Sequence, residues 1–240
     1  APTTDLDGSP RPNPAGTLPD MGAYESDKGV APNYAGPVWY VDGPAGLPYG
    51  NGGPGAPFTT IQAGIDAAAD GDTVSVKAGT YVENPDFSGK NIAVIGEDQE
   101  TTIIDGNQAG SVVSFSRAET ANAKLIGFTI QDGNSSTGGG IHISTANASS
   151  SDVTSPTFSI LLFINNNGYR GGGIYAIYSS FVLSKSIIKG NTGDGFGAGI
   201  FSEYGSPQIL SSNIKQNTTD NSGGGIYLAC LLYTSDAADE

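Results

Sequence analysis

The sequence is poor in cysteine, in basic side chains and in long apolar runs. A single Cys among 240 residues excludes an internal disulfide framework and the zinc sites that are built from several thiolates. Ten Lys and Arg stand against 24 Asp and Glu, a net charge of −14, which argues against nucleic acid or an anionic membrane surface as a partner. No apolar run approaches the ~18 residues of a membrane span, so we expect none.

Glycine, by contrast, is abundant. The chain holds 36 Gly among 240 residues, or 15%, about twice the usual ~7%. Apolar residues make up 37%, which is enough for a core and argues against a wholly disordered chain. The length fits one large domain or two small ones. We therefore expect a folded chain with many tight bends.

Both ends of the chain differ in composition from its middle. Residues 1–37 are rich in Pro, Gly and Asp and predict an irregular segment followed by a linker. No leader peptide is visible at Ala1. Residues 230–240 (CLLYTSDAADE) resemble the translation of a sequencing adapter, and a short amphipathic tail is the alternative. On the first interpretation we expect a fragment of a larger protein, whose natural part contains no Cys.

One helix is predicted near the start of the folded part. Residues 38–41 are strand-like, and a loop rich in Gly and Pro separates them from the helix at 58–70. Thr59 or Thr60 can cap its start, and the Asp-Gly-Asp at 70–72 ends it. Its apolar stripe consists of residues at helical spacing: Phe58, Ile61, Ile65 and Ala68.

After residue 73 the sequence repeats with a period of about 26 residues. A Gly-rich tripeptide followed by Ile recurs four times, ending at Ile141, Ile174, Ile200 and Ile226, with steps of 33, 26 and 26. The extra seven residues fit a polar insertion around 146–155. A second predicted ladder, with steps of 26, 34, 24 and 26, is Ile104, Ile130, Ile164, Ile188 and Ile214. A third is Asn167, Asn191 and Asn217.

Such a period predicts stacked coils, because one coil of short strands cannot bury its apolar face alone. Parallel strands would lie ~4.8 Å apart, and alternation along each strand would point the Ile of the Gly-Ile motif inward. The Gly runs suit bends at positive φ, and the repeated Asn suit left-handed geometry and amide ladders. The helix would cap the first coil. The residues that follow the four Ile would form an outward column: His142, Tyr175, Phe201 and Tyr227.

The sequence resembles the right-handed parallel β-helix repeat proteins of the pectin-lyase-like superfamily. The resemblance covers about residues 38–229 and is carried by the Gly-Ile repeats and by 40–42 (YVD), 57–62 (PFTTIQ), 71–74 (GDTV), 79–81 (GTY), 102–106 (TIIDG) and 127–130 (GFTI). It implies an all-β, right-handed parallel β-helix solenoid with an N-terminal amphipathic capping helix. It also implies a modular, exported bacterial protein that is secreted or displayed on the cell surface.

The opening residues, 5–11 (DLDGSPR) and 20–25 (DMGAYE), are similar to the closing segment of such domains. The resemblance thus implies that 1–26 close a preceding β-helix, that 27–37 form a linker, and that 38–229 form a second β-helix truncated at its C-terminal end. Asp5-x-Asp7-Gly8 resembles the start of a Ca²⁺ loop but lacks its later ligands. We expect a family turn motif there and no cofactor, with Ca²⁺ as the open alternative.

The enzymes of this superfamily cleave polysaccharides, and the sequence matches their motifs poorly. Its hydrolases carry Asn-Thr-Asp, an Asp pair, Gly-His-Gly and Arg-Ile-Lys; residues 191–194 (NTGD) are a broken form of the first, and the lone His142 lies in Gly-Ile-His-Ile. Its lyases need acids around Ca²⁺ and a basic residue. No spacing forces together the charged residues of the repeat region, Arg170, Lys189, Asp194, Glu203 and Asp220, which we interpret as solvated turn residues. We predict no catalytic residue.

The outward column is the candidate ligand site. Its members would sit one coil apart, close to the length of one sugar in an extended glycan, and aromatic faces pack well against sugar C–H surfaces. The alternative is that the rings only stabilise the sheet, at roughly 0.2–1 kcal/mol per pair.

Two classes of function remain. The first is a non-catalytic exported repeat domain for surface display, adhesion or glycan contact, with a polysaccharide as its partner. The second is a polysaccharide lyase or glycoside hydrolase whose site is incomplete in this chain, and convergent acids with an Arg or Lys in one groove would favour it. We also expect self-association through an open parallel edge at the C-terminal coil.

Overall fold

The computed structural model describes residues 34–43, 46, 50–145 and 153–229. The chain divides into two compact units, Ala1–Ala35 and Gly36–Glu240. The predicted closing segment at 1–26, most of the linker at 27–37 and the tail at 230–240 lie outside the described residues, as does most of the insertion around 146–155. The fold below is that of the second unit. No helix in the described part of the chain is long and apolar enough to cross a membrane.

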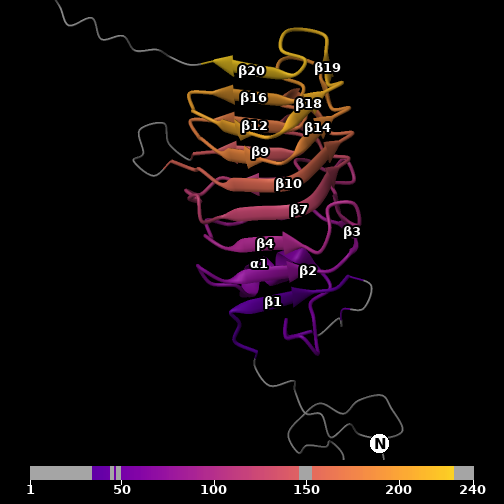
Figure 1. Ribbon diagram of the computed structural model, residues 1–240, viewed down its shortest axis with the longest axis vertical. Helices are drawn as coiled ribbons and strands as arrows, with labels where there is room; N and C mark the ends of the chain where they lie inside the picture. Colours follow the sequence, from indigo (N-terminus) through magenta and orange to yellow (C-terminus); the bar gives the residue numbers. More distant parts are fainter. Residues whose placement is uncertain (1–33, 44–45, 47–49, 146–152, 230–240) are drawn as a thin grey trace, which may run out of the picture. The chain divides into compact units, whose positions relative to one another are not determined.

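The strands of this unit form three sheets (Figure 1). A five-stranded sheet contains β6 (Val113–Phe115), β9 (Ile141–Ser144), β12 (Ile174–Ile177), β16 (Ile200–Glu203) and β20 (Ile226–Ala229). A four-stranded sheet contains β8 (Asn134–Thr137), β11 (Asn167–Arg170), β15 (Thr192–Gly193) and β19 (Thr218–Thr219).

The third and largest sheet has eleven strands. Its main path runs through β1 (Val38–Val41), β2 (Thr73–Val76), β4 (Ala93–Gly96), β7 (Lys124–Gln131), β10 (Thr157–Ile164), β13 (Val182–Ser184) and β17 (Gln208–Leu210). The other four strands continue from this path around the coil: β3 (Gly79–Val82), β5 (Thr102–Asp105), β14 (Ile187–Lys189) and β18 (Asn213–Lys215).

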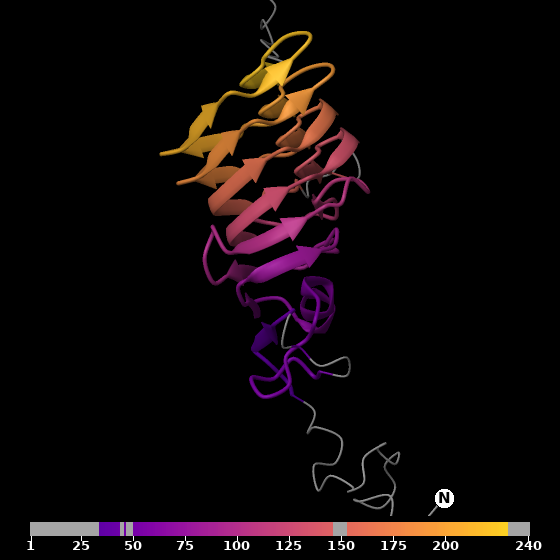
Figure 2. The ribbon, with the colours of Figure 1, turned by 90° about the vertical axis from the view of Figure 1, so that its right-hand side faces the viewer.

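From β7 onward each pass of the chain adds a strand to every sheet, and the paired strands are parallel. For example, β7 pairs with β10, β8 with β11 and β9 with β12. Successive coils therefore lie one strand spacing apart, ~4.8 Å. Figure 2 shows the strands of successive coils one above another. This arrangement confirms the predicted all-β solenoid of the parallel β-helix type.

The Gly-Ile repeat has the predicted register. Ile174 pairs with Ile141 and with Ile200, and Ile200 pairs with Ile226. The first three of these Ile are fully buried. The first Gly of each repeat adopts a left-handed backbone, with φ of 72°, 68°, 62° and 74° at Gly138, Gly171, Gly197 and Gly223. A side chain at this φ would be strained, so the need for glycine at these bends is backbone geometry.

The second Ile ladder and the Asn ladder were each predicted one residue out of register at one position, Ile164 and Asn167. Phe163, and not Ile164, pairs with Ile130 and with Ile188, so the steps become 33 and 25. Phe163 is fully buried, while Ile164 pairs with Gln131 on the outer side of the sheet. Both residues are apolar, so hydrophobicity could not distinguish them, and a one-residue slip exchanges the two faces of a strand.

The amide ladder shows the same slip, because Asn166 and not Asn167 is its first member. Asn166 Nδ2 donates to Asn191 Oδ1 at 2.9 Å, and Asn191 Nδ2 donates to Asn217 Oδ1 at 2.9 Å. The left-handed residues at this bend are the ones before each Asn: Asn165, Gly190 and Gln216. The prediction of an amide ladder is confirmed, whereas the prediction of left-handed geometry at its Asn residues is wrong.

The helix is shorter than predicted: α1 spans Ile61–Ala67 instead of 58–70. Thr60 is its N-cap and accepts a hydrogen bond from the backbone N–H of Ala63 at 3.2 Å. Phe58, expected in the apolar stripe, precedes the helix and bridges to Val41. The helix ends early because Ala68 is already extended and leads the chain toward β2.

The helix covers the inner side of the first coils. A Cβ at Gly64 would approach Val74 Cγ1 to 2.6 Å and Val41 Cγ2 to 3.0 Å, so only glycine allows the helix to lie this close to β1 and β2. Further along, the interior is filled by a ladder of phenylalanines whose ring centroids lie 4.2 to 5.9 Å apart: Phe87, Phe115, Phe158 and Phe181. Packing between coils is thus continuous from the helix onward.

Candidate functional site

The predicted column exists in the predicted register on the five-stranded sheet. Tyr175 pairs with His142 and with Phe201, and Phe201 pairs with Tyr227. Their rings stack, with centroids 5.3, 5.4 and 5.2 Å apart and interplanar angles of 26°, 10° and 4° along the column.

The column is on the outer face of the strands. Its two central rings are shielded from solvent, whereas His142 and Tyr227 at its ends are half-buried. Only 5% of Tyr175 and 2% of Phe201 is exposed. Arg170, at the end of β11, lies over the Phe201 ring at 5.4 Å from its centroid. Both faces of the two central rings, which a sugar would need, are covered by the neighbouring rings. This geometry favours the sheet-stabilising alternative, and the ligand role of the column stays a prediction.

His142, at one end of the column, is held by local hydrogen-bond partners. Its Nδ1 lies 3.1 Å from the Thr137 carbonyl oxygen and its Nε2 lies 3.2 Å from the Ser144 hydroxyl. Burial lowers the pKa of His142, and the contact with Thr137 opposes this only in part. Burial therefore favours the neutral imidazole over the charged one in the folded chain.

Beside the column, two further tyrosines stack at the solvent surface. Tyr178 and Tyr204 follow β12 and β16, with ring centroids 4.7 Å apart at 11°, and 37% and 36% of each residue is exposed. The negative charge of Glu203 raises the pKa of Tyr204, with burial and Tyr178 adding to the effect. Sequence reasoning missed this pair, although the spacing of three residues after Tyr175 and Phe201 repeats in both coils.

The charged residues of the repeat region do not gather into one constellation. Arg170 and Glu203 both act on Tyr175, whose pKa burial raises. Lys189 lies next to Lys215 in the register of the neighbouring strands β14 and β18. Asp194 and Asp220 follow β15 and β19 at the end of the four-stranded sheet. Within the described ranges, no three His, Cys, Asp or Glu side chains are grouped so that they could hold a metal ion. The Asp5–Gly8 motif lies outside those ranges.

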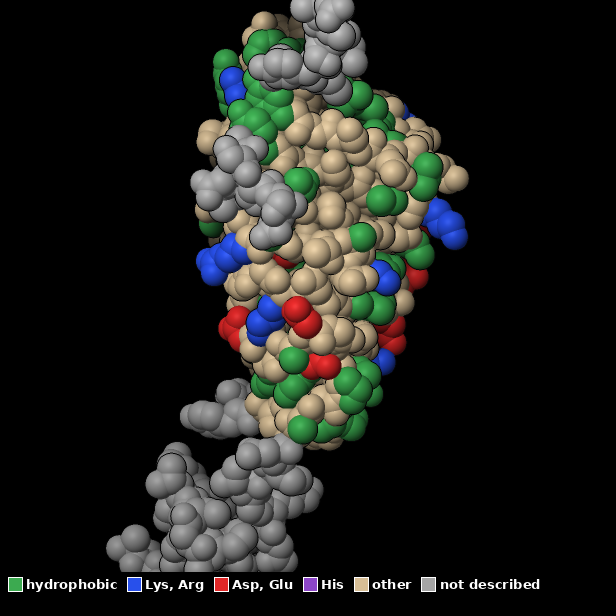
Figure 3. All heavy atoms as spheres, turned by 90° about the vertical axis from the view of Figure 1, so that its left-hand side faces the viewer, with side chains coloured by type: hydrophobic (Ala, Val, Ile, Leu, Met, Phe, Trp, Pro, Cys, Tyr) green, Lys and Arg blue, Asp and Glu red, His purple; other side chains and the backbone are tan. Residues whose placement is uncertain are grey.

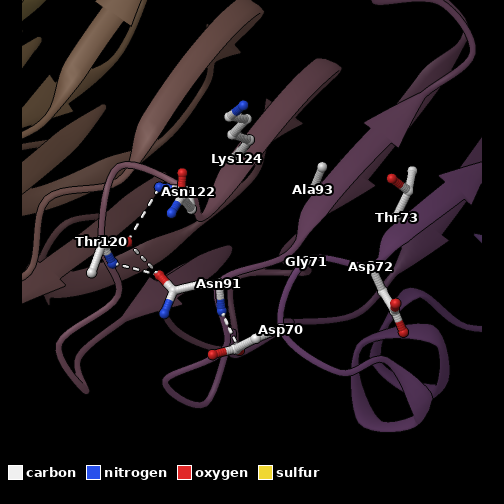
Figure 4. Close-up of a pocket in the computed structure, with 9 residues that line it drawn as sticks. All are labelled: Asp70, Gly71, Asp72, Thr73, Asn91, Ala93, Thr120, Asn122 and Lys124. Carbon is white, nitrogen blue, oxygen red and sulfur yellow. Dashed lines mark hydrogen bonds between the residues drawn. The ribbon is translucent and has the colours of Figure 1, made fainter. Parts of the chain in front are cut away.

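A groove opens at the bend where the chain enters β2, β4 and β7 (Figure 4). It has a volume of about 660 Å³, within the ~300–1,000 Å³ of small-molecule sites. Its lining comes from three successive coils: Asp70, Gly71, Asp72 and Thr73; Asn91 and Ala93; Thr120, Asn122 and Lys124. We refer to these nine residues as the corner groove. Sequence reasoning did not find it, because residues separated by up to 54 positions build it.

Hydrogen bonds between coils hold the walls of the corner groove. Asp70 Oδ1 accepts from the backbone N–H of Asn91 at 2.9 Å. Asn91 Oδ1 accepts from the backbone N–H and from the hydroxyl of Thr120, at 2.8 and 2.7 Å. Asp72 Oδ2 accepts from Trp39 Nε1 of the preceding coil and, within its own turn, from the backbone N–H of Ala69, both at 2.9 Å. The two bonds from Thr120 fix the side-chain oxygen of Asn91, and its NH₂ group points away from Thr120 (Figure 4).

Several polar atoms of the corner groove have no protein partner within the described part of the chain. They are Asp70 Oδ2, Asn91 Nδ2, the side-chain amide of Asn122 and Lys124 Nζ. The set offers acceptors and donors together, which is what a ligand with many hydroxyl groups requires. On the side of the molecule where this bend lies, acidic and basic side chains gather over the coils nearer the N-terminal end (Figure 3).

The same bend recurs in the later coils. In the large sheet Lys124 pairs with Thr157, Thr157 with Val182, and Val182 with Gln208. Tyr178 and Tyr204 precede the last two of these residues, so they occupy the bend that forms the corner groove further down. The bend is therefore polar in the first coils and aromatic in the later ones.

No protein-family model matches the chain, and no curated protein or solved structure matches it either.

Proposed function

We propose that this chain is a non-catalytic, exported repeat domain of the pectin-lyase-like type that serves surface display or adhesion by contacting glycans. The observation that carries the proposal is the corner groove, which carboxylate, amide and ammonium groups from three coils line. Within the described residues, Asp70 Oδ2, Asn91 Nδ2, the Asn122 amide and Lys124 Nζ have no protein partner. Sugars present hydroxyls that donate and accept, and such a mixed set can satisfy them.

The scaffold supports this assignment in a second way. The walls of the groove are joined by hydrogen bonds between coils, so that the side chains of Asp70 and Asn91 are held before any ligand arrives. A site that is already formed loses less conformational entropy on binding. Secretion or cell-surface location is part of the proposal and rests on the sequence resemblance.

The proposal is tested by screening the chain on a glycan array and comparing it with the Asn91→Ala/Asn122→Ala double variant. We expect the wild-type chain to bind a subset of glycans and the double variant to lose that signal. Asn213→Ala is the matched control, because Asn213 is an exposed amide on β18, outside the groove. The absence of binding by the wild-type chain, or equal binding by the double variant, would contradict the proposal.

The predicted ligand residues of the column enter the same screen. If Tyr175→Ser/Tyr227→Ser loses glycan binding at a temperature where it is still folded, the column is a site as well. We expect it to lose stability instead, because its rings cover one another.

A further inference from the structure

We infer that the corner groove binds an uncharged, linear oligosaccharide that lies along the solenoid axis, with about one ring unit per coil and three units in all. This inference rests on the proposed function and adds the ligand's length, direction and charge. It is carried by the strand register, by the charges that line the groove, and by the small side chain at its centre.

The direction follows from the register of the three strands that enter from the groove. Thr73 pairs with Ala93, and Ala93 pairs with Lys124, so the groove crosses β2, β4 and β7 in strict succession. Two strand steps span ~10 Å along the axis. This is the distance between the centres of the first and third ring units of an extended glycan, because each unit is about as long as one coil step.

Each coil is one level of the groove and presents polar groups at the bend. The first coil offers Asp70 and Thr73, the second Asn91, and the third Asn122 and Lys124. Gly71 N donates to the Asn91 carbonyl oxygen at 2.9 Å, which keeps the first two levels in register. A ligand whose hydroxyl groups repeat once per coil would meet a partner at every level.

The charges favour an uncharged ligand over a polyuronate. Asp70 and Asp72 line one end of the groove, against the single ammonium of Lys124 at the other. The neighbouring ammonium of Lys90 is occupied, because it donates to the carbonyl oxygens of Ile65, Asp66 and Ala68. The chain as a whole carries a net charge of −14 and repels polyanions. The Lys124 ammonium would then donate to a ligand hydroxyl.

Ala93 leaves the middle of the groove open. It lies between Thr73 and Lys124 on the outer face of the sheet, where a longer side chain would occupy the space of the central ring unit. A substitution there fills the groove without removing any of its polar groups. Ile95 provides a matched control, since it lies two positions further along β4 on the same outer face, 36% exposed and outside the groove.

The experiment is calorimetric titration of the full chain with β-1,4-linked glucose oligomers of one to six units, and with oligogalacturonates of the same lengths. We expect the affinity for the glucose series to rise up to three units and then to level off. Oligogalacturonate should bind about tenfold more weakly. Ala93→Tyr should weaken the binding of the glucose trimer about tenfold or more, and Ile95→Tyr should leave it unchanged.

The inference is overturned if affinity does not depend on length up to three units, if oligogalacturonate binds as tightly as the glucose series, or if Ala93→Tyr binds as the wild-type chain does. Circular dichroism of the two Tyr variants checks that both are folded. If the array shows binding that depends on Asn91 and Asn122 while these titrations fail, the proposed function stands and only the ligand assignment falls. If no glycan binds the wild-type chain in either experiment, both fall.

Discussion

Tyr175 shows how one side chain of the column stabilises two neighbouring coils. Its ring stacks on His142 on one side and on Phe201 on the other, and only 5% of the residue is exposed. We expect Tyr175→Ser to lower the free energy of unfolding by about 3 kcal/mol, since the change removes both ring contacts and leaves a cavity.

Thermal or urea unfolding measures this effect. Tyr169→Ser is the control, because Tyr169 is 49% exposed and its loss should change stability little. A Tyr175→Ser variant as stable as the wild-type chain would show that the stacked column does not hold the coils together.

His142 should make stability depend on pH. Burial lowers the pKa of His142 in the folded chain, while the unfolded chain keeps the ordinary value of about 6.5. Below that value the unfolded state binds more protons than the folded state, so stability is lost as the pH falls toward the folded pKa. Above it the imidazole is neutral in both states, and the contribution is fully present.

The measurement compares the wild-type chain with His142→Phe, which keeps a ring in the stack but cannot titrate. Lowering the pH from about 7.5 to about 5.5 should destabilise the wild-type chain more than the variant. Parallel losses in both proteins would mean that other groups cause the pH dependence.

At the scale of the elements, the short helix depends on two charged side chains from the next coil. Glu83 accepts from the backbone N–H groups of Ile61 and Gln62 at 2.8 and 3.0 Å, at the start of α1. Lys90 Nζ donates at 2.7 and 2.8 Å to carbonyl oxygens at the end of α1. Opposite charges thus lie at the two helix ends where the unpaired backbone groups need them. Burial raises the pKa of Glu83, and the two backbone hydrogen bonds oppose this rise.

We expect Lys90→Met to destabilise the chain by about 1–2 kcal/mol, because three carbonyl oxygens lose their donor. Lys77→Met is the matched control: it removes an ammonium that pairs with Glu97 in an exposed position. Unfolding measurements on the two variants, made side by side, compare how much free energy of unfolding each substitution removes. Equal effects of both substitutions would show that the contact with the helix end contributes nothing special.

At the scale of the whole molecule, the last described coil exposes residues whose equivalents are buried. Ile226 is 39% exposed, whereas Ile200 one coil earlier is fully buried. Leu228 is 54% exposed, whereas its partner Ser202 is 2% exposed. Apolar side chains and unpaired strand edges exposed together favour association with other chains.

We therefore expect the chain to self-associate through this coil, with the association growing with protein concentration. Leu228→Lys should shift the equilibrium toward the monomer, because it places a charge in the contact. Leu210→Lys is the control: Leu210 is 51% exposed but lies on the outer face of β17, since it pairs with Ser184 and not with the buried Leu183. Light scattering that shows a monomer for the wild-type chain at every concentration would refute this expectation.

The coil architecture and the register of the Gly-Ile strands could be predicted from the sequence alone. Glycine at a left-handed bend and alternation along a strand are local properties, so they can be read without knowing the neighbours. The four Ile, the column after them and the first strand at 38–41 were all predictable for this reason.

Tertiary structure decided what local signals could not. Ile164 and Asn167 were assigned to ladders that belong to Phe163 and Asn166, because adjacent residues of similar chemistry differ only in the face they take. The centre of the column proved to be shielded, since its exposure depends on rings from other coils and on Arg170 of the neighbouring sheet. The corner groove brings together residues from three coils, and only the stacking of those coils places Asp70, Asn91 and Lys124 around one ligand-sized space.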